Sequence, residues 1–386
     1  MTPLVLRIIE IVAVVGTVAS WSYFLLCSYS AAVFLRRKNL DTPSELPPVS
    51  ILKPLKGVDP EIYESFRSHC LQDYPQYEII FGVSDPDDPA TASVQQLQRE
   101  FPDRAIRLAV CPKILGANVK VSNLVQMLPH AQYDFLLVND SDIRVEPGYL
   151  HRIMAPLADA NTGMVTCLYR GIAAPTLGSK LEALGISTDF AAGVLAANAL
   201  EGGIHFGLGS TLAFRRTDLA RIGGFEAILD YLADDYELGH RIAASGKRVH
   251  LAEVVVETHV PTYNLAGYFS HQLRWSRGIR DSRPGGYFGL IFTFGLMWSI
   301  IAVAFSAGAT WAWELFGATL ALRYLQAWTV GHSVLRDRQL LTQLWLLPLR
   351  DFFGVAIWVA SFAGHTVTWR GTRFLLKRGK LIRMKR

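Results

Sequence analysis

Residues 134–142 of the chain read DFLLVNDSD, a short apolar run followed directly by amide and acidic residues. The run Asp134–Val138 predicts a strand that is buried on both faces, and the polar residues from Asn139 onward end it. Asp140 and Asp142 stand at positions i and i+2, so their carboxylates can point the same way and suit a hard divalent cation. Acidic surface loops also contain such a pair, and it is the preceding strand that favours a metal site here.

Short strands and helices alternate around this run. Strands are predicted at Val49–Leu52, Tyr77–Ser84 and Ile106–Val110, and helices at Ile62–Cys70, Thr91–Phe101 and Ala117–Leu128. This order predicts an α/β domain with a mainly parallel, Rossmann-like sheet and helices on both faces. Ligands of such sheets bind beyond the carboxyl ends of the strands. Lys53, Asp85 and Asp140 are predicted to lie at that edge.

The composition is unusual for a soluble protein. The chain has 386 residues, of which 51% are hydrophobic and 18% charged, whereas about a quarter is charged in ordinary domains. The formal charge is +5, but Arg370–Arg386 alone contributes +8, which leaves −3 for the rest. A nucleic-acid-binding fold would spread its basic residues over the fold, so we expect no nucleic-acid partner. The four scattered cysteines predict neither a zinc site nor a disulfide framework.

Apolar segments at both ends of the chain predict membrane insertion. Ile11–Leu35 has no charged residue and is followed by Arg36–Lys38, so we interpret it as a transmembrane helix with the following domain in the cytoplasm. Tyr287–Trp313 is also uncharged. The next segment, Trp311–Val334, carries Arg323 near its middle. A charge at that depth normally faces protein, either for packing or for function.

These segments divide the chain into four predicted parts. They are an N-terminal transmembrane anchor (1–36), an α/β domain (37–285), C-terminal membrane helices (286–369) and a basic juxtamembrane tail (370–386). Three spans after the domain would put the basic tail outside, against the positive-inside rule, so we interpret Leu340–Trp369 as a re-entrant or interfacial hairpin. Leu177–Leu200 fits either a core helix or a helix lying at the membrane surface. The tail is expected to bind anionic lipid head groups.

Further candidates for chemistry have two interpretations each. Lys120 is a solvated helix residue or a contact to a phosphate or nucleoside. Asp234 and Asp235 precede a helical stretch, either as acidic residues of its first turn or with Asp235 as a general base near a sugar. Arg274 and Trp275 lie just before the second apolar block, either as a juxtamembrane anchor or as a diphosphate clamp and a sugar platform.

Taken together, these motifs resemble the ceramide glucosyltransferase family, glycosyltransferase family 21, over nearly the whole chain. That family carries three separated aspartate motifs and a (Q/R)xxRW motif. The residues that match are Asp85, Asp140, Asp142, Asp235, Arg274 and Trp275. The resemblance implies a GT-A fold with membrane helices at both ends. His271 stands where the family has Gln or Arg, which is a departure from the pattern.

The resemblance also implies a reaction. We expect inverting transfer of one sugar from UDP-glucose or UDP-N-acetylglucosamine to a hydroxyl of a membrane lipid. The stretch from His205 to Arg216 resembles the bacterial hopanoid-associated branch, so bacteriohopanetetrol is the first candidate for that lipid. The enzyme would sit in the bacterial inner membrane with its catalytic domain in the cytoplasm. The alternatives are a ceramide glucosyltransferase, a processive polysaccharide synthase, a transferase to polyprenyl phosphate and a non-catalytic scaffold. His271 and the short membrane block argue against the synthase.

Each candidate residue receives a role from this resemblance. Asp235 is the expected catalytic base. Mg²⁺ or Mn²⁺ would be bound by Asp142 and Asp140. The donor would contact Lys53, Pro54, Asp85, Lys120 and Asp140. The leaving group or the acceptor would contact His205, Asp234, His271, Arg274 and Trp275.

Overall fold

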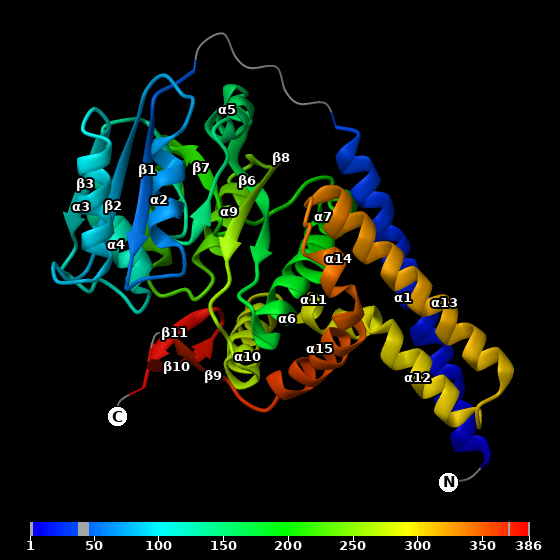
Figure 1. The fold of residues 1–386 in the computed structure, drawn as a ribbon. Helices are drawn as coiled ribbons and strands as arrows, with labels where there is room; N and C mark the ends of the chain where they lie inside the picture. Colours follow the sequence, from blue (N-terminus) through cyan, green and yellow to red (C-terminus); the bar gives the residue numbers. More distant parts are fainter. Residues whose placement is uncertain (1–2, 38–45, 370, 385–386) are drawn as a thin grey trace.

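The computed structural model describes residues 3–37, 46–369 and 371–384. Lys38 and Pro43, which belong to the predicted charge cluster and linker, lie outside the described residues. The chain forms an α/β domain around a large sheet, a group of apolar helices beside it, and a small C-terminal sheet (Figure 1). The bundle of long helices leads away from the domain in the figure.

The large sheet has eight strands in the order β3-β2-β1-β4-β7-β6-β8-β5. Their bounds are β1 Val49–Leu55, β2 Tyr77–Val83, β3 Ala105–Val110, β4 Phe135–Val138, β5 Ile143–Arg144, β6 Thr162–Ile172, β7 Leu212–Arg215 and β8 Arg248–His259. Strand β1 pairs in parallel with β2 and β4, and β6 with β8, while β7 runs antiparallel to both neighbours. The predicted mainly parallel α/β fold is confirmed.

Helices cover both faces of the large sheet. They are α2 Ile62–Cys70, α3 Ala90–Glu100, α4 Val119–Met127, α5 Tyr149–Met154, α8 Arg216–Arg221 and α9 Asp234–Ala244. One face buries Phe66 against Phe81, and the other buries Met127 and Phe214. Helix α4 begins two residues later than predicted because Asn118 caps it, accepting a hydrogen bond from the backbone N–H of Val121 at 3.2 Å.

The remaining helices are mostly apolar. They are α1 Pro3–Leu35, α6 Leu177–Gly185, α7 Ala191–Leu200, α10 Leu265–Ser282, α11 Pro284–Gly289, α12 Gly295–Phe305, α13 Thr310–Ala327, α14 Leu340–Gln343 and α15 Leu347–Ser361. Helices α1, α12 and α13 lie side by side (Figure 1). In the described part of the chain, three helical stretches are long and apolar enough to cross a membrane, at Pro3–Leu35, Leu177–Leu200 and Leu340–Ser361. A fourth is added if the bent pair Pro284–Thr293 and Gly295–Phe305 counts as one span.

The stretch Leu177–Leu200 lies between the large sheet and the apolar helices. It consists of α6 and α7, joined by a π-helical segment at Ile186–Phe190. In its most apolar segment of 18 residues, 67% is buried inside the protein. The whole stretch contacts β6, α1, α10 and α15. Of its two interpretations, the packed core helix therefore describes it better.

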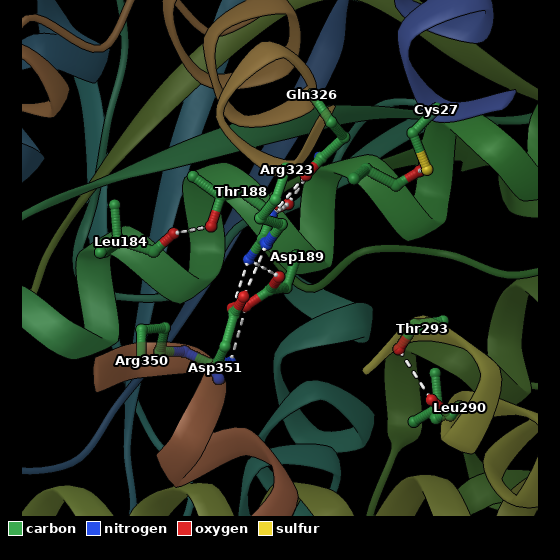
Figure 2. A network of polar contacts seen from close by, with 11 residues as sticks. Cys27, Leu184, Thr188, Asp189, Leu290, Thr293, Arg323, Gln326, Arg350 and Asp351 are labelled. Carbon is green, nitrogen blue, oxygen red and sulfur yellow. Dashed lines mark hydrogen bonds and ion pairs between the residues drawn. The ribbon is translucent and has the colours of Figure 1, made fainter. Parts of the chain in front are cut away.

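A cluster of ion pairs holds the apolar helices to this stretch, and we call Asp189, Arg323, Arg350 and Asp351 the helix ion cluster. Arg323 is 2% exposed and binds the carboxylates of Asp189 at 2.6 Å and Asp351 at 2.7 Å (Figure 2). Arg350 lies 3.1 Å from the other oxygen of Asp189. Two guanidinium groups thus balance two carboxylates. The prediction that Arg323 faces protein is confirmed.

Most of the described residues in the predicted basic tail, 370–386, belong to a small antiparallel sheet. Its strands are β9 Thr366–Trp369, β10 Thr372–Lys377 and β11 Lys380–Arg383. Phe374, Leu376 and Leu381 are buried on its inner face beside Ala117 and Leu232. Exposed residues, among them Arg373, Lys377 and Lys380, alternate with these buried ones, so one face of the sheet packs on the domain. The interfacial hairpin expected at 340–369 likewise ends in a strand, β9.

The small sheet is bonded to the α/β domain. The backbone N–H of Leu381 donates to the carbonyl of Asp230 at 2.7 Å, and that of Leu232 donates to the carbonyl of Gly379 at 3.0 Å. The two parts therefore lie on the same side of any membrane that the chain crosses. It follows that the chain between β8 and β9 crosses such a membrane an even number of times.

Candidate functional site

Six charged side chains meet at the carboxyl ends of β1 and β4. We call them the aspartate cluster, which comprises Lys53, Lys120, Asp140, Asp142, Asp234 and Asp235. The Lys120 ammonium lies 2.7 Å from a carboxylate oxygen of Asp140 and 2.9 Å from one of Asp234. The buried Lys53 ammonium donates to the backbone carbonyl of Asp140 at 3.0 Å. The predicted donor and metal residues of β1, α4 and β4 are thus brought together with the first turn of α9.

Gly209 lies between the two halves of this cluster. Its backbone N–H donates to Oδ2 of Asp235 at 2.8 Å, and its carbonyl accepts from the N–H of Asp140 at 3.3 Å. A Cβ at this position would stand 2.7 Å from Oδ2 of Asp140 and 3.3 Å from Oδ2 of Asp235. A side chain at this position would therefore displace the Asp140 carboxylate. The other oxygen of Asp235 accepts from the N–H of Tyr236 at 2.8 Å, so backbone donors fix the carboxylate on both sides.

Two carboxyl groups in the cluster have raised pKa values. Burial, and then the charge of Asp140, raise the pKa of Asp142 to about 6, although the Thr258 hydroxyl donates to it. Burial, and then the charge of Asp234, raise the pKa of Asp235 to about 6. A carboxylate with a pKa near neutrality is well suited to accept a proton from a hydroxyl.

The two lysines behave differently. Burial lowers the pKa of Lys53 to about 7, despite the nearby carboxylates of Asp142 and Asp140. Burial also works against the charge of Lys120, but the carboxylates of Asp140 and Asp234 outweigh it and raise that pKa above its usual range. With every group ionised, four carboxylates face two ammonium groups, so the cluster has a net charge of −2.

The chemistry of the cluster fits a divalent cation. Asp140 and Asp142 offer hard oxygen ligands, and their mutual repulsion is a cause of the raised pKa of Asp142. Among the described residues, no group of three or more His, Cys, Asp or Glu side chains is arranged to hold a metal ion. The protein would therefore contribute the carboxylates of Asp140 and Asp142, and phosphate oxygens or water would complete the shell.

Three predicted residues lie away from the centre of the cluster. Asp85 is exposed, and its side chain accepts from the N–H of Asp87 at 3.0 Å in a tight turn. It follows the end of β2, which pairs with β1 at Pro54, so both belong to the same sheet edge. His205 is exposed and contacts Glu201 at 3.0 Å. The structure thus brings Asp85 and Pro54 to the same edge of the sheet and places His205 beside Glu201.

Of the predicted residues of α10, His271 contacts α6. His271 lies 3.1 Å from a carboxylate oxygen of Glu182, and the amide of Gln272 donates to the same oxygen at 3.0 Å. Glu182 is 2% exposed. The Trp275 ring is 5.2 Å from the ring of His271 and 6.2 Å from that of Phe190. Gln272, the residue after His271, therefore binds the same carboxylate, that of Glu182.

Aromatic side chains connect the aspartate cluster to the apolar helices. Burial, and then the charge of Asp235 and of Glu182, hold the pKa of Tyr169 well above its usual range, so both carboxylates lie near its hydroxyl. The ring of Tyr169 is 5.1 Å from that of Phe190. Arg274 is near enough to Tyr263 to act against the burial that raises the Tyr263 pKa to about 12. We call the rings of Tyr169, Phe190 and Trp275 the aromatic wall. It extends from Asp235 toward α7 and α10.

The chain is matched by a family model described as Glycosyl transferase family 21, over residues 12–382. It belongs to that family. The predicted family is confirmed, and so is the prediction of an enzyme: this family 21 member is a glycosyltransferase of the UDP-sugar-dependent type. The match includes the aspartate cluster, α10 and most of the small sheet.

Curated relatives of this family 21 member are similar over different lengths. Ceramide glucosyltransferase 1 of Caenorhabditis elegans is 22% identical over 373 residues, which cover 91% of this chain and 76% of the relative. The ceramide glucosyltransferase of Komagataella phaffii is 36% identical over 123 residues, 31% of this chain and 24% of the relative. The higher identity is thus confined to a short region.

A solved structure supports the fold of this family 21 member. The mannosyltransferase PcManGT from Pyrobaculum calidifontis, solved with GDP-Man and Mn²⁺, aligns with a TM-score of 0.57 and 23% identity. The alignment covers 92% of this chain and 98% of that one. The predicted GT-A-type fold with an N-terminal apolar helix and further apolar helices is confirmed.

Sequence reasoning missed three residues of the site. Gly209 aligns the two halves of the aspartate cluster, Thr258 of β8 donates to Asp142, and Tyr169 of β6 begins the aromatic wall. The segment Gly207–Gly209, with two glycines around one leucine, is a signal of close backbone approach that could have pointed to Gly209. Thr258 and Tyr169 carry no comparable local signal.

Proposed function

We propose that this family 21 glycosyltransferase moves one sugar from UDP-glucose or UDP-N-acetylglucosamine to a hydroxyl of a membrane lipid, with inversion at the anomeric carbon. The observation that carries the proposal is Asp235. Its carboxylate is held by the N–H groups of Gly209 and Tyr236, has a pKa of about 6, and lies where the aspartate cluster meets the aromatic wall. That position suits a base between a donor and a lipid.

On the donor side, the lysines and the diphosphate have complementary charge. Lys120 is kept charged by Asp140 and Asp234, and it would face the donor phosphates. Asp85 would contact the nucleoside end, and Arg274 would bind the departing diphosphate. A Mg²⁺ or Mn²⁺ ion held by Asp140 and Asp142 would neutralise charge that develops on UDP.

The reaction then needs one proton acceptor. Asp235 takes the proton of the lipid hydroxyl while that oxygen forms a bond to the anomeric carbon. The bond between that carbon and the UDP oxygen breaks on the opposite side, and its electron pair leaves with UDP. The proton remains on Asp235 until it passes to solvent. Asp234 is bound to Lys120 instead, so it supports the charge of its neighbour rather than the transfer itself.

The acceptor would arrive along the apolar helices. Phe190 and Trp275 extend the aromatic wall from Tyr169 toward α7 and α10, and such rings offer flat apolar contacts to a large ring system or chain. We propose a hopanoid, bacteriohopanetetrol, because the stretch from His205 to Arg216 resembles the hopanoid-associated branch. Ceramide is the second candidate, and the curated relatives favour it.

The membrane arrangement follows from the same elements. Helix α1 and the apolar helices beside it would anchor the enzyme in a bacterial inner membrane. Arg36 and Arg37 follow α1 directly, which supports a cytoplasmic position of the catalytic domain. UDP-sugars are then available to the site from the cytoplasm.

The proposal is tested on purified enzyme in nanodiscs. UDP-glucose and UDP-N-acetylglucosamine are each supplied with bacteriohopanetetrol, ceramide or polyprenyl phosphate, and the lipid products are identified by mass. We expect one hexose or N-acetylhexosamine on bacteriohopanetetrol, and no product from the Asp235→Asn variant. A sugar on ceramide alone would replace the hopanoid acceptor. A polymer, a sugar phospholipid or no UDP release with any lipid would overturn the proposal.

A further inference from the structure

The small sheet closes a pocket on the α/β domain. The pocket has a volume of about 1080 Å³, and β10 and β11 form one wall of it. Lys56, Ala117 and Tyr231 of the α/β domain also line it. Each belongs to a segment that leads into the aspartate cluster: Lys56 follows Lys53, Ala117 precedes Lys120, and Tyr231 precedes Asp234. The pocket is therefore lined by residues that stand three positions along the chain from members of the aspartate cluster.

The wall is held in a defined position. Arg378 and Gly379 both have positive φ, 53° and 77°, which makes the tight two-residue turn that suits a right-twisted hairpin. The N–H of Gly379 donates to the carboxylate of Asp281 in α10. The backbone bonds from Leu232 and Leu381 tie the hairpin to the segment just before Asp235. A rigid wall of this kind can place side chains against a ligand.

The wall carries an excess of positive charge. Lys377, Arg378, Lys380 and Arg383 line the pocket and are exposed, and the exposed Lys56 of the domain also lines it. Asp230 is the one acidic residue of the lining, and it accepts a hydrogen bond from the N–H of Ala117 at 2.9 Å. Five cations against one carboxylate make this pocket a site for an anion.

Two of these lysines repel each other when no anion is bound. Lys377 of β10 and Lys380 of β11 are direct cross-strand partners. Like charges at directly opposite positions destabilise a strand pair. An anion bound between the two side chains would remove that repulsion.

We propose that the small sheet is part of the donor site and that its cations bind the phosphates of the UDP-sugar and of the UDP product. This rests on the proposed function and names a further element of it. The three domain segments that line the pocket all continue into the aspartate cluster, and an extended nucleotide spans the few residues between them. Phosphate oxygens accept strong, charge-assisted hydrogen bonds from ammonium and guanidinium groups.

The test is a single charge reversal, Lys377→Glu, in full-length enzyme in phosphatidylcholine nanodiscs with a fixed concentration of Mg²⁺. Isothermal titration measures the Kd of UDP and of uridine. We expect the Kd of UDP to rise about tenfold, since a charge-assisted hydrogen bond is lost, and that of uridine to stay unchanged. The melting temperature should not fall, because the substitution places a carboxylate opposite Lys380.

The matched control is Arg373→Glu. Arg373 is an exposed cation on the same strand, β10, but it does not line the pocket, so its reversal should leave the Kd of UDP unchanged. Equal weakening in both variants, equal weakening for uridine, or an effect seen only in phosphatidylglycerol nanodiscs would overturn the phosphate role. Wild-type enzyme that binds UDP while Lys377→Glu binds it equally well would overturn this inference alone. Wild-type enzyme that binds no UDP would overturn the proposed function as well.

Discussion

The helix ion cluster and the aspartate cluster are built from similar charged groups, but their charges are balanced differently. In the helix ion cluster, Arg323 and Arg350 meet two carboxylates and every charge has a partner nearby. In the aspartate cluster, four carboxylates meet two lysines, and the pKa values of Asp142 and Asp235 rise to about 6. A cluster with balanced charges holds elements together, whereas the excess negative charge of an unbalanced cluster favours the binding of a cation or a proton.

The first prediction separates the two clusters by their chemistry and has the largest expected effect. Asp235→Asn keeps the size of the side chain and can keep only one of its two backbone hydrogen bonds, because the amide nitrogen cannot accept from an N–H. It removes the proton acceptor, so turnover should fall by about 10³-fold. Calorimetry should show UDP binding within about twofold of the wild type, because Asp235 is placed on the acceptor side. Near-normal turnover would remove Asp235 from the role of base.

The second prediction concerns the helix ion cluster. Arg323→Met leaves Asp189 and Asp351 with one fewer cation, and breaking a buried pair in this way costs about 3–5 kcal/mol of stability. We expect a large drop in the melting temperature in detergent, with unchanged kcat in the fraction that remains folded.

The double variant Arg323→Met with Asp351→Leu serves as the control for this change. It leaves Asp189 paired with Arg350, so it should recover part of the lost stability. A melting temperature equal to that of the wild type in the single variant would show that this cluster does not hold the helices.

The third prediction concerns the backbone that aligns the aspartate cluster. Gly209→Ala adds a carbon 2.7 Å from a carboxylate oxygen of Asp140, which displaces Asp140 relative to Asp235. Misplacement of this size should lower kcat/KM by about 10²-fold. Gly148→Ala is the control, since nothing lies within 4 Å of its added carbon. Equal activity of the two variants would mean that the close approach at Gly209 has no role.

Several elements of the fold and of the two clusters can be predicted from the sequence. The apolar run Phe135–Val138 ends at the first metal candidate, Asp140, and the predicted helix Ile62–Cys70 agrees with α2 at both ends. These elements are determined by short-range patterns of apolar and polar residues. The lone charge of Arg323 in an apolar segment likewise predicts a protein partner.

Other features depend on contacts between distant residues and have no local pattern. Asp189 and Asp351 are 134 and 28 positions from Arg323, so the sequence does not show which carboxylates pair with it. The small sheet was missed for another reason. The alternation of Phe374 and Leu376 with exposed neighbours predicts a strand, whereas the density of cations in the same segment predicts a basic tail.

The most direct test of the account is the pH dependence of kcat/KM at saturating Mg²⁺. A bound cation keeps Asp142 ionised, so the acid side of the profile reports Asp235. Asp235 accepts a proton only when deprotonated, and its pKa is about 6 instead of the usual 3.8. We predict that the wild-type rate falls about tenfold per pH unit below about 6, and that the residual rate of Asp235→Asn does not change over this range. An acid limb that persists unchanged in Asp235→Asn would contradict the claim that Asp235 accepts the proton.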